Sequence, residues 1–272
     1  MPQSSATITV PIRPLARQVI MPRPDYPTTI SLPVSPVAPY PPRALPLQGL
    51  TILVVEDSRY ACEALRLIAQ RAGARLRRAE TLETARAHLR TYRPDVAIID
   101  LGLPDGRGEA LIRDLVVARP RTAAIIGISG LPSGRGSALA AGADGFLDKP
   151  LGSYAEFCAV LSRFLPDRVD LPGAVLTSPL PEPDPLALHD DLERAAEALG
   201  HAPDAARQRY ISGFLCGLAR ATQDSGLADA SASAAQGPEG LAPLRALLSS
   251  RLSDPGGLIA PGPEIGQDLT KG

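Results

Sequence analysis

Short apolar runs alternate with amphipathic stretches between Leu50 and Leu165, and this alternation limits the fold more than any other feature of the chain. Strands of a parallel sheet are buried on both faces and read as apolar runs, whereas the helices that cover them show apolar residues at a three-to-four spacing. The pattern predicts an α/β domain with five βα units. Strands are expected at 51–55, 75–79, 96–99, 123–128 and 145–147.

The predicted helices carry their own boundary signals. Ser58 and Thr81 are placed to cap the first two helices, and Gly73 is placed to end the first. Gly134 and Gly136 stand where the fourth helix should begin, and glycine disfavours helix by about 1 kcal/mol relative to alanine. We therefore expect a frayed start to that helix. The last helix of the domain is expected over 154–164.

Proline divides the remainder of the chain into segments, because it breaks helices and cannot donate to a sheet. Residues 1–48 are predicted to be a disordered, Pro-rich leader, 49–166 the α/β domain, and 167–185 a Pro-rich linker. Residues 186–254 carry apolar stripes that predict a small all-α segment, and 255–272 a disordered tail. The leader is interpreted as a solvated tail; a ligand for proline-recognition domains is the alternative.

Charge and composition exclude several classes of function. The chain after the α/β domain has clearly more Asp and Glu than Arg, which would repel a phosphate backbone, so nucleic acid is not expected as a partner. No stretch approaches the roughly 20 apolar residues of a membrane span. Cys62, Cys158 and Cys216 lie far apart without a disulfide or metal pattern, which favours a reducing, cytoplasmic setting.

Polar residues follow four of the predicted strands at the point where each strand ends. They are Glu56 and Asp57, then Asp100, Ser129 and Lys149. In an open parallel sheet, ligands bind outside the carboxyl ends of the strands. Carboxylates that gather there repel one another and bind a hard cation readily. The sequence therefore predicts a magnesium site.

The same residue types are those of a metal-assisted phosphoryl-transfer site. With Mg²⁺ present, the Asp100 carboxylate could attack a phosphoryl donor to give an aspartyl-phosphate. Only two of the 28 basic residues are lysines, so a compact ammonium kept at Lys149 suggests a required point charge. The Ser129 hydroxyl could meet a further phosphoryl oxygen. As a structural alternative, each of these residues could be an ordinary cap or surface charge.

Residues 50–165 resemble the receiver domain of bacterial two-component response regulators. Four segments carry the resemblance: Leu53-Val54-Val55-Glu56-Asp57-Ser58, Asp100-Leu101-Gly102-Leu103-Pro104-Asp105-Gly106, Ile128-Ser129-Gly130, and Gly142-Ala143-Asp144-Gly145-Phe146-Leu147-Asp148-Lys149-Pro150. The resemblance implies a doubly wound, flavodoxin-like sheet with strand order 2-1-3-4-5. It implies a signalling domain that phosphorylates itself in the presence of Mg²⁺, not a conventional enzyme.

The resemblance also implies roles for individual residues. Asp100 corresponds to the phosphoacceptor, Asp57 to a direct metal ligand, Glu56 to a ligand through water, and the Gly102 carbonyl completes the metal shell.

Further roles concern the conformational switch. Ser129 corresponds to the switch hydroxyl and Phe146 to the aromatic residue that turns inward. Pro150 is expected to follow a cis peptide that aims Lys149 into the site, and the fourth helix, fifth strand and fifth helix are expected to form the output face.

Two hypotheses of function follow. In the first, a histidine kinase or phosphotransfer protein phosphorylates Asp100, and the signal passes by contact with a protein partner or with the chain's own C-terminal helices. In the second, the domain is a constitutive scaffold that does not cycle, a reading that the glycines of the fourth helix motivate. His189 is interpreted as an ordinary residue of a helix start, with phosphotransfer as the alternative.

Overall fold

A computed structural model describes residues 45–166, 182–200 and 203–253. These residues belong to one compact unit, Arg43–Gly272. Residues 1–44 of the predicted leader, 167–181 of the linker and the whole predicted tail lie outside the described residues.

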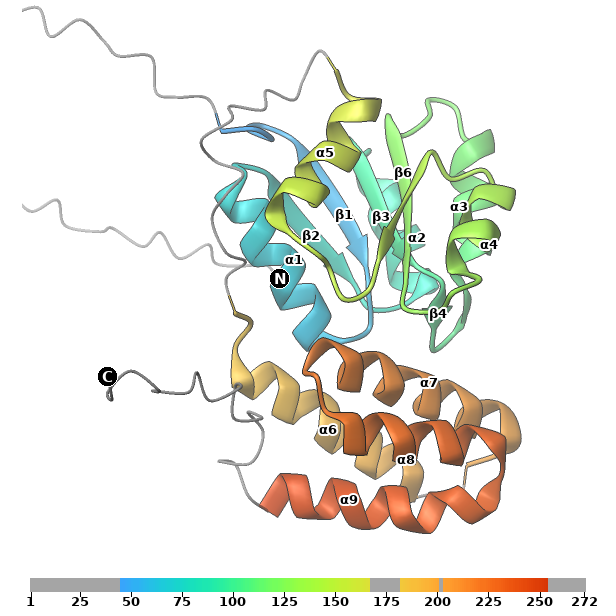
Figure 1. Cartoon of the computed structure of the whole chain (residues 1–272). Coiled ribbons are helices and arrows are strands. Elements are labelled where there is room, and N and C mark those ends of the chain that lie inside the picture. The colour runs from blue at the N-terminus through green and yellow to red at the C-terminus, as the bar shows by residue number, and fades with distance from the viewer. Residues whose placement is uncertain (1–44, 167–181, 201–202, 254–272) are drawn as a thin grey trace, which may run out of the picture. The chain divides into compact units, whose positions relative to one another are not determined.

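A five-stranded parallel sheet forms the centre of the α/β domain (Figure 1), with the order β2-β1-β3-β6-β7. This order corresponds to 2-1-3-4-5 among the expected strands and confirms the predicted fold class. The strands are β1 (Thr51–Val55), β2 (Arg75–Ala79), β3 (Val96–Asp100), β6 (Ala124–Ser129) and β7 (Gly145–Asp148). Asp100 lies in register with Ile128, and Ser129 lies in register with Asp148. The register brings the polar strand ends to one edge of the sheet.

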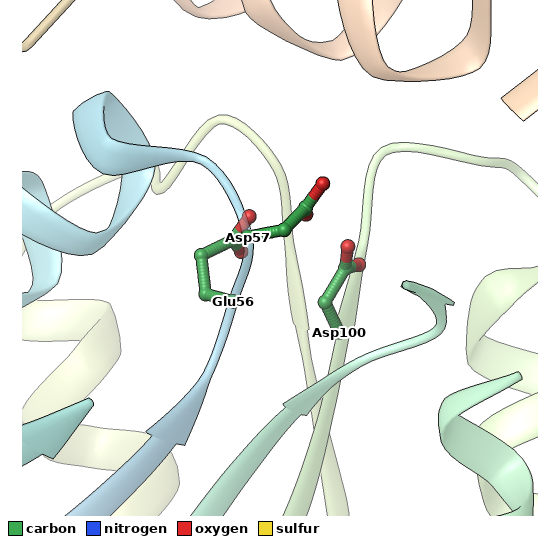
Figure 2. Close-up of side chains that lie close together, drawn as sticks. All are labelled: Glu56, Asp57 and Asp100. Carbon is green, nitrogen blue, oxygen red and sulfur yellow. The ribbon is translucent and has the colours of Figure 1, made fainter. Parts of the chain in front are cut away.

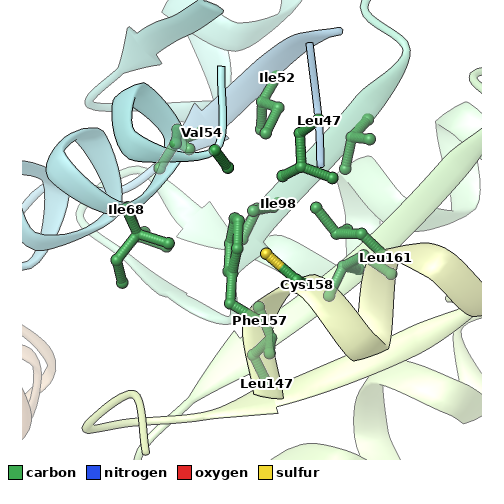
Figure 3. Packing of buried hydrophobic residues seen from close by; sticks show 14 of the residues in the cluster. Leu47, Ile52, Val54, Ile68, Ile98, Leu147, Phe157, Cys158 and Leu161 are labelled. Carbon is green, nitrogen blue, oxygen red and sulfur yellow. The ribbon is translucent and has the colours of Figure 1, made fainter. Parts of the chain in front are cut away.

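Two apolar cores flank the sheet. The first lies between the sheet and helices α1 (Arg59–Arg71) and α5 (Tyr154–Phe164), with Ile52, Ile98 and Phe157 fully buried in it (Figure 3). The second lies under α2 (Leu82–Thr91), α3 (Gly108–Val117) and α4 (Gly134–Ala140). Leu47, which the sequence analysis assigned to the leader, is fully buried in the first core, and its N–H donates to the Ala72 carbonyl at 2.8 Å.

Local sequence explains how the first two helices begin. The Ser58 hydroxyl accepts a hydrogen bond from the Ala61 N–H at 3.0 Å and caps α1. Thr81 forms a capping box with Thr84 at the start of α2. The connection between β3 and α3 contains a short antiparallel pair, β4 (Gly102–Leu103) and β5 (Gly106–Arg107).

Four helices form a third apolar core in the C-terminal segment. They are α6 (Pro185–Gly200), α7 (Ala205–Ala221), α8 (Ser225–Gln236) and α9 (Leu241–Ser253), with a 3₁₀ turn at Pro238–Gly240. We call residues 182–200 and 203–253 the C-terminal module. Their buried side chains include Leu192, Leu199, Leu215 and Leu244. The segment is all-α, as predicted from its apolar stripes. Helix α8 carries alanines, which favour helix, and its cap Asp224 accepts from the Leu227 N–H at 2.9 Å.

Candidate functional site

Three carboxylates gather at the ends of β1 and β3 (Figure 2). Glu56, Asp57 and Asp100 each place an oxygen within 4.8 Å of the others. Their exposed fractions are only 1%, 5% and 7%, so solvent does little to screen their repulsion. Hard oxygen donors at this spacing are the ligands that Mg²⁺ takes in proteins. The cluster therefore fits the predicted cation.

Lys149 reaches the same cluster from the end of β7. Its Nζ lies 2.5 Å from Glu56 Oε2 and 3.3 Å from Asp100 Oδ1. The Lys149 N–H donates to the Ser129 carbonyl at 3.0 Å, which continues the pairing of β6 and β7 by one residue. The Lys149–Pro150 peptide is cis. All four charged side chains that the sequence analysis selected are thus in one place.

Burial dominates the electrostatics of the site. Burial raises the pKa of Asp57 from 3.8 to about 6, although a hydrogen bond from the Tyr210 hydroxyl lowers it in part. Burial also raises the pKa of Glu56, and the nearby Lys149 charge offsets part of that rise. For Lys149 itself, burial acts to lower the pKa, but the charges of Asp100 and Glu56 outweigh it and hold the pKa above its usual range. The cluster is short of positive charge, which a divalent ion would supply.

The predicted switch residues lie on neighbouring strands, Ser129 in β6 and Phe146 in β7. The Ser129 hydroxyl accepts the Leu131 N–H at 3.2 Å, and the Phe146 ring is buried with 4% exposure. An added Cβ on Gly134 would lie 2.8 Å from the Ser129 Cβ and 3.1 Å from the Phe146 Cζ. Close packing therefore gives a reason for glycine at the first residue of α4, where the sequence analysis considered only fraying.

Gly102 lies two residues beyond Asp100, in β4. An added Cβ on Gly102 would stand 3.9 Å from Asp100 Oδ2, so this backbone passes next to the carboxylate. Gly108 closes the same loop, and an added Cβ there would stand 2.0 Å from the Asp100 carbonyl oxygen. The loop is therefore held tightly against the end of β3.

Sequence reasoning missed a group of side chains that the C-terminal module brings to the site. The Tyr210 hydroxyl donates to Asp57 Oδ2, and the Arg220 guanidinium donates to the Gly130 carbonyl. Asp191 accepts from the Ser58 hydroxyl at 2.7 Å. A cavity of about 900 Å³ remains beside these contacts, lined by the acidic cluster and by residues of α7 such as Gly213 and Gly217.

The sequence signals for these contacts were weak. Tyr210 reads as one member of an apolar stripe, and Asp191 reads as one of two carboxylates at a helix start. Neither pattern indicates a partner in another part of the chain.

The described residues contain no helix long and apolar enough to cross a membrane.

A family model described as the response regulator receiver domain matches residues 52–160. Among curated proteins, the KDP operon transcriptional regulatory protein KdpE of Escherichia coli (strain K12) is 39% identical over 101 residues, which cover 37% of this chain and 45% of that protein. The transcriptional regulatory protein PhoP of the same strain is 42% identical over 64 residues, 24% of this chain and 29% of its own length. The chain spans less than half the length of these relatives.

Solved structures of receiver domains are also similar to part of the chain. A putative response regulator from Chloroflexus aurantiacus J-10-fl is 28% identical with a TM-score of 0.41, covering 43% of this chain and 98% of that one. The receiver domain of the sensor histidine kinase PA1611 from Pseudomonas aeruginosa PAO1, with a magnesium ion in its active site cleft, is 25% identical with a TM-score of 0.40 over 43% of this chain and 98% of its own.

Proposed function

We propose that this chain, whose residues 52–160 are a response regulator receiver domain, is a cytoplasmic response regulator that accepts a phosphoryl group on Asp100. A histidine kinase or phosphotransfer protein is the donor. The observation that carries the proposal is the convergence of Glu56, Asp57, Asp100 and Lys149 at one edge of the sheet. Residues that stand at the ends of different strands meet in one buried cluster.

Mg²⁺ fits the cluster because the three carboxylates are hard oxygen donors and outnumber the Lys149 charge. Asp57 and Asp100 would hold the ion directly, Glu56 through water, and the Gly102 carbonyl would complete the shell. Bound there, the ion would neutralise charge on the phosphoryl oxygens.

The side chains of the chain have separate tasks in the proposed transfer. An Asp100 carboxylate oxygen forms the new bond to phosphorus as the bond from phosphorus to the donor nitrogen breaks. The Lys149 ammonium, 3.3 Å from Asp100 Oδ1, pairs with one phosphoryl oxygen, and the Ser129 hydroxyl donates to another. Burial of the cluster keeps bulk water from screening these interactions.

Intact-mass measurement tests this proposal directly. The full chain is incubated with MgCl₂ and acetyl phosphate, and the wild type should gain one phosphoryl group, whereas Asp100→Asn should gain none. Asp105→Asn is the matched control, since Asp105 lies in the same loop but accepts the Leu82 and Glu83 N–H groups at the start of α2. A wild-type chain that never gains the mass, with or without Mg²⁺, would refute the function.

We further propose that the output is protein contact and not nucleic-acid binding. The C-terminal module carries more Asp and Glu than Arg, which disfavours a phosphate backbone. The names of the curated relatives include transcriptional regulation, and that favours the opposite outcome. Fluorescence anisotropy with mixed-sequence duplex DNA at low salt separates the two. Binding by the phosphorylated chain would refute the protein-contact output.

A constitutive scaffold is the second candidate function. It is favoured by the Tyr210 and Arg220 contacts, which hold the C-terminal module against the site. A pull-down with and without acetyl phosphate tests this candidate, because a scaffold predicts that the phosphorylated wild type and Asp100→Asn bind partners with the same affinity.

A further inference from the structure

Helix α7 touches both sides of the acidic cluster. The Tyr210 hydroxyl donates a hydrogen bond to Oδ2 of Asp57, one of the predicted metal ligands. Arg220, ten residues further along the same helix, donates to the carbonyl of Gly130, the residue that follows Ser129. Ten residues of helix span about 15 Å. One continuous helix therefore connects the predicted metal ligand with the predicted switch segment.

Helix α6 anchors this arrangement at the start of α1. Asp191 is fully buried and accepts from the Ser58 hydroxyl at 2.7 Å and from the Arg59 and Tyr60 N–H groups at 3.0 Å each. The first N–H groups of a helix have no partner within the helix, and a carboxylate is favourable at that end. Arg194 donates to Asp191 at 2.6 Å and so pairs its charge. The contact is specific and leaves the first turn of α1 with its donors satisfied.

We propose that the C-terminal module is an intramolecular ligand of the acidic site, and that Tyr210 competes with Mg²⁺ for Asp57. This inference rests on the proposed function. Mg²⁺ requires a near-octahedral shell and keeps several waters in it. The phenol hydrogen-bonded to Asp57 Oδ2 engages one of the two carboxylate oxygens that Asp57 could offer to the ion, and with the module in place Asp57 is only 5% exposed. Binding of the ion and docking of the module therefore oppose each other.

The Arg220 contact extends the competition to the phosphoryl group. In the structure the Ser129 hydroxyl accepts the Leu131 N–H, and Arg220 holds the carbonyl of the intervening Gly130. A phosphoryl group on Asp100 would draw the Ser129 hydroxyl toward its oxygens, which shifts the carbonyl away from Arg220. Coupling between two binding events is reciprocal. If Mg²⁺ or the phosphoryl group weakens docking of the C-terminal module, a substitution that weakens this docking should tighten Mg²⁺ binding by the same factor.

Tyr210→Phe in the full chain tests the competition, because it removes the hydroxyl and keeps the ring. Tyr92→Phe is the matched control, since Tyr92 lies at the end of α2 with its ring against His88. Calorimetric titration with MgCl₂ should give about tenfold tighter binding for Tyr210→Phe than for the wild type and for Tyr92→Phe, within the roughly 5- to 150-fold range of typical coupling. Arg220→Gln, at the other end of α7, should also tighten Mg²⁺ binding and provides a second variant.

Hydrogen exchange supplies a readout that does not depend on phosphoryl transfer. Mg²⁺ should accelerate exchange of the Arg59 and Tyr60 amides in the wild type, because both are bonded to Asp191 only while the module is docked. Equal Mg²⁺ affinity in the wild type and both variants, or exchange that Mg²⁺ leaves unchanged, would overturn the competition while the proposed function stands. A chain that binds no Mg²⁺ in any variant would overturn both.

Discussion

Asp191→Ala should free the first turn of α1 from the C-terminal module. The carboxylate is fully buried and accepts the Arg59 and Tyr60 N–H groups at 3.0 Å each. A hydrogen bond to a charged acceptor contributes about 1.5–3 kcal/mol. Since about 1.4 kcal/mol corresponds to a factor of ten, these two amides should exchange about 10- to 150-fold faster in the variant.

Residue-resolved hydrogen exchange of the full chain measures this effect. The Ala61 N–H is an internal reference, because it is bonded to the Ser58 hydroxyl at 3.0 Å and keeps that partner in the variant. Asp190→Ala is the matched control: Asp190 pairs with the Arg59 guanidinium at a partly exposed site, and such pairs contribute about 0–1 kcal/mol. If Asp191→Ala and Asp190→Ala change the exchange rates of the two amides equally, or if neither changes them, the inference that Asp191 of α6 caps α1 is wrong.

Four further predictions concern the site and its packing. Lys149→Gln should slow phosphorylation by acetyl phosphate about 10²- to 10³-fold, as followed by intact mass over time, because one charged donor to the phosphoryl group is lost. Burial raises the pKa of Asp57 from 3.8 to about 6, so Mg²⁺ affinity measured by calorimetry should fall up to about tenfold per pH unit below pH 6. Without the metal, the free energy of unfolding changes with pH in the opposite direction. Because the pKa of Asp57 is raised, its carboxyl stabilises the fold fully below pH 3.8, and this contribution is lost as the pH rises to about 6. Urea denaturation at several pH values should show this loss in the wild type and not in Asp57→Asn. Gly127→Ala should destabilise the domain by about 1–3 kcal/mol in urea, because the new Cβ would stand 2.5 Å from the Ala138 Cβ, whereas Gly136→Ala, with nothing within 4 Å, should be neutral or stabilising.

Periodicity and strand-end chemistry were enough to predict the sheet and its acidic edge. Parallel strands present their carboxyl ends at one edge, so Asp57, Asp100 and Lys149 converge once the five runs are read as neighbouring strands. The order of those strands came from the family resemblance, because periodicity alone does not order them. The signals that end each element, such as the Ser58 cap, were equally local.

Contacts between distant parts of the chain were beyond sequence reasoning. Leu47 reads as part of a proline-rich segment, yet its side chain packs into the first core. Asp191 and Ser58 are 133 residues apart, and nothing in either local pattern specifies the other. Gly134 shows the same limit, since its requirement for a missing Cβ comes from Ser129 and Phe146, which other elements supply.

The proposed competition between the C-terminal module and Mg²⁺ follows from the cost of burying the Asp57 carboxylate. Burial leaves the Asp57 carboxylate with little water, while Arg78 and Arg194 donate to its backbone carbonyl and not to its side chain. A buried carboxylate is costly without a donor or a cation. The Tyr210 hydroxyl supplies such a donor. Mg²⁺ would stabilise the Asp57 carboxylate more than the hydroxyl does, because the ion also offsets the charges of Glu56 and Asp100. The C-terminal module would then lose the Tyr210 hydrogen bond that favours its docking at the site.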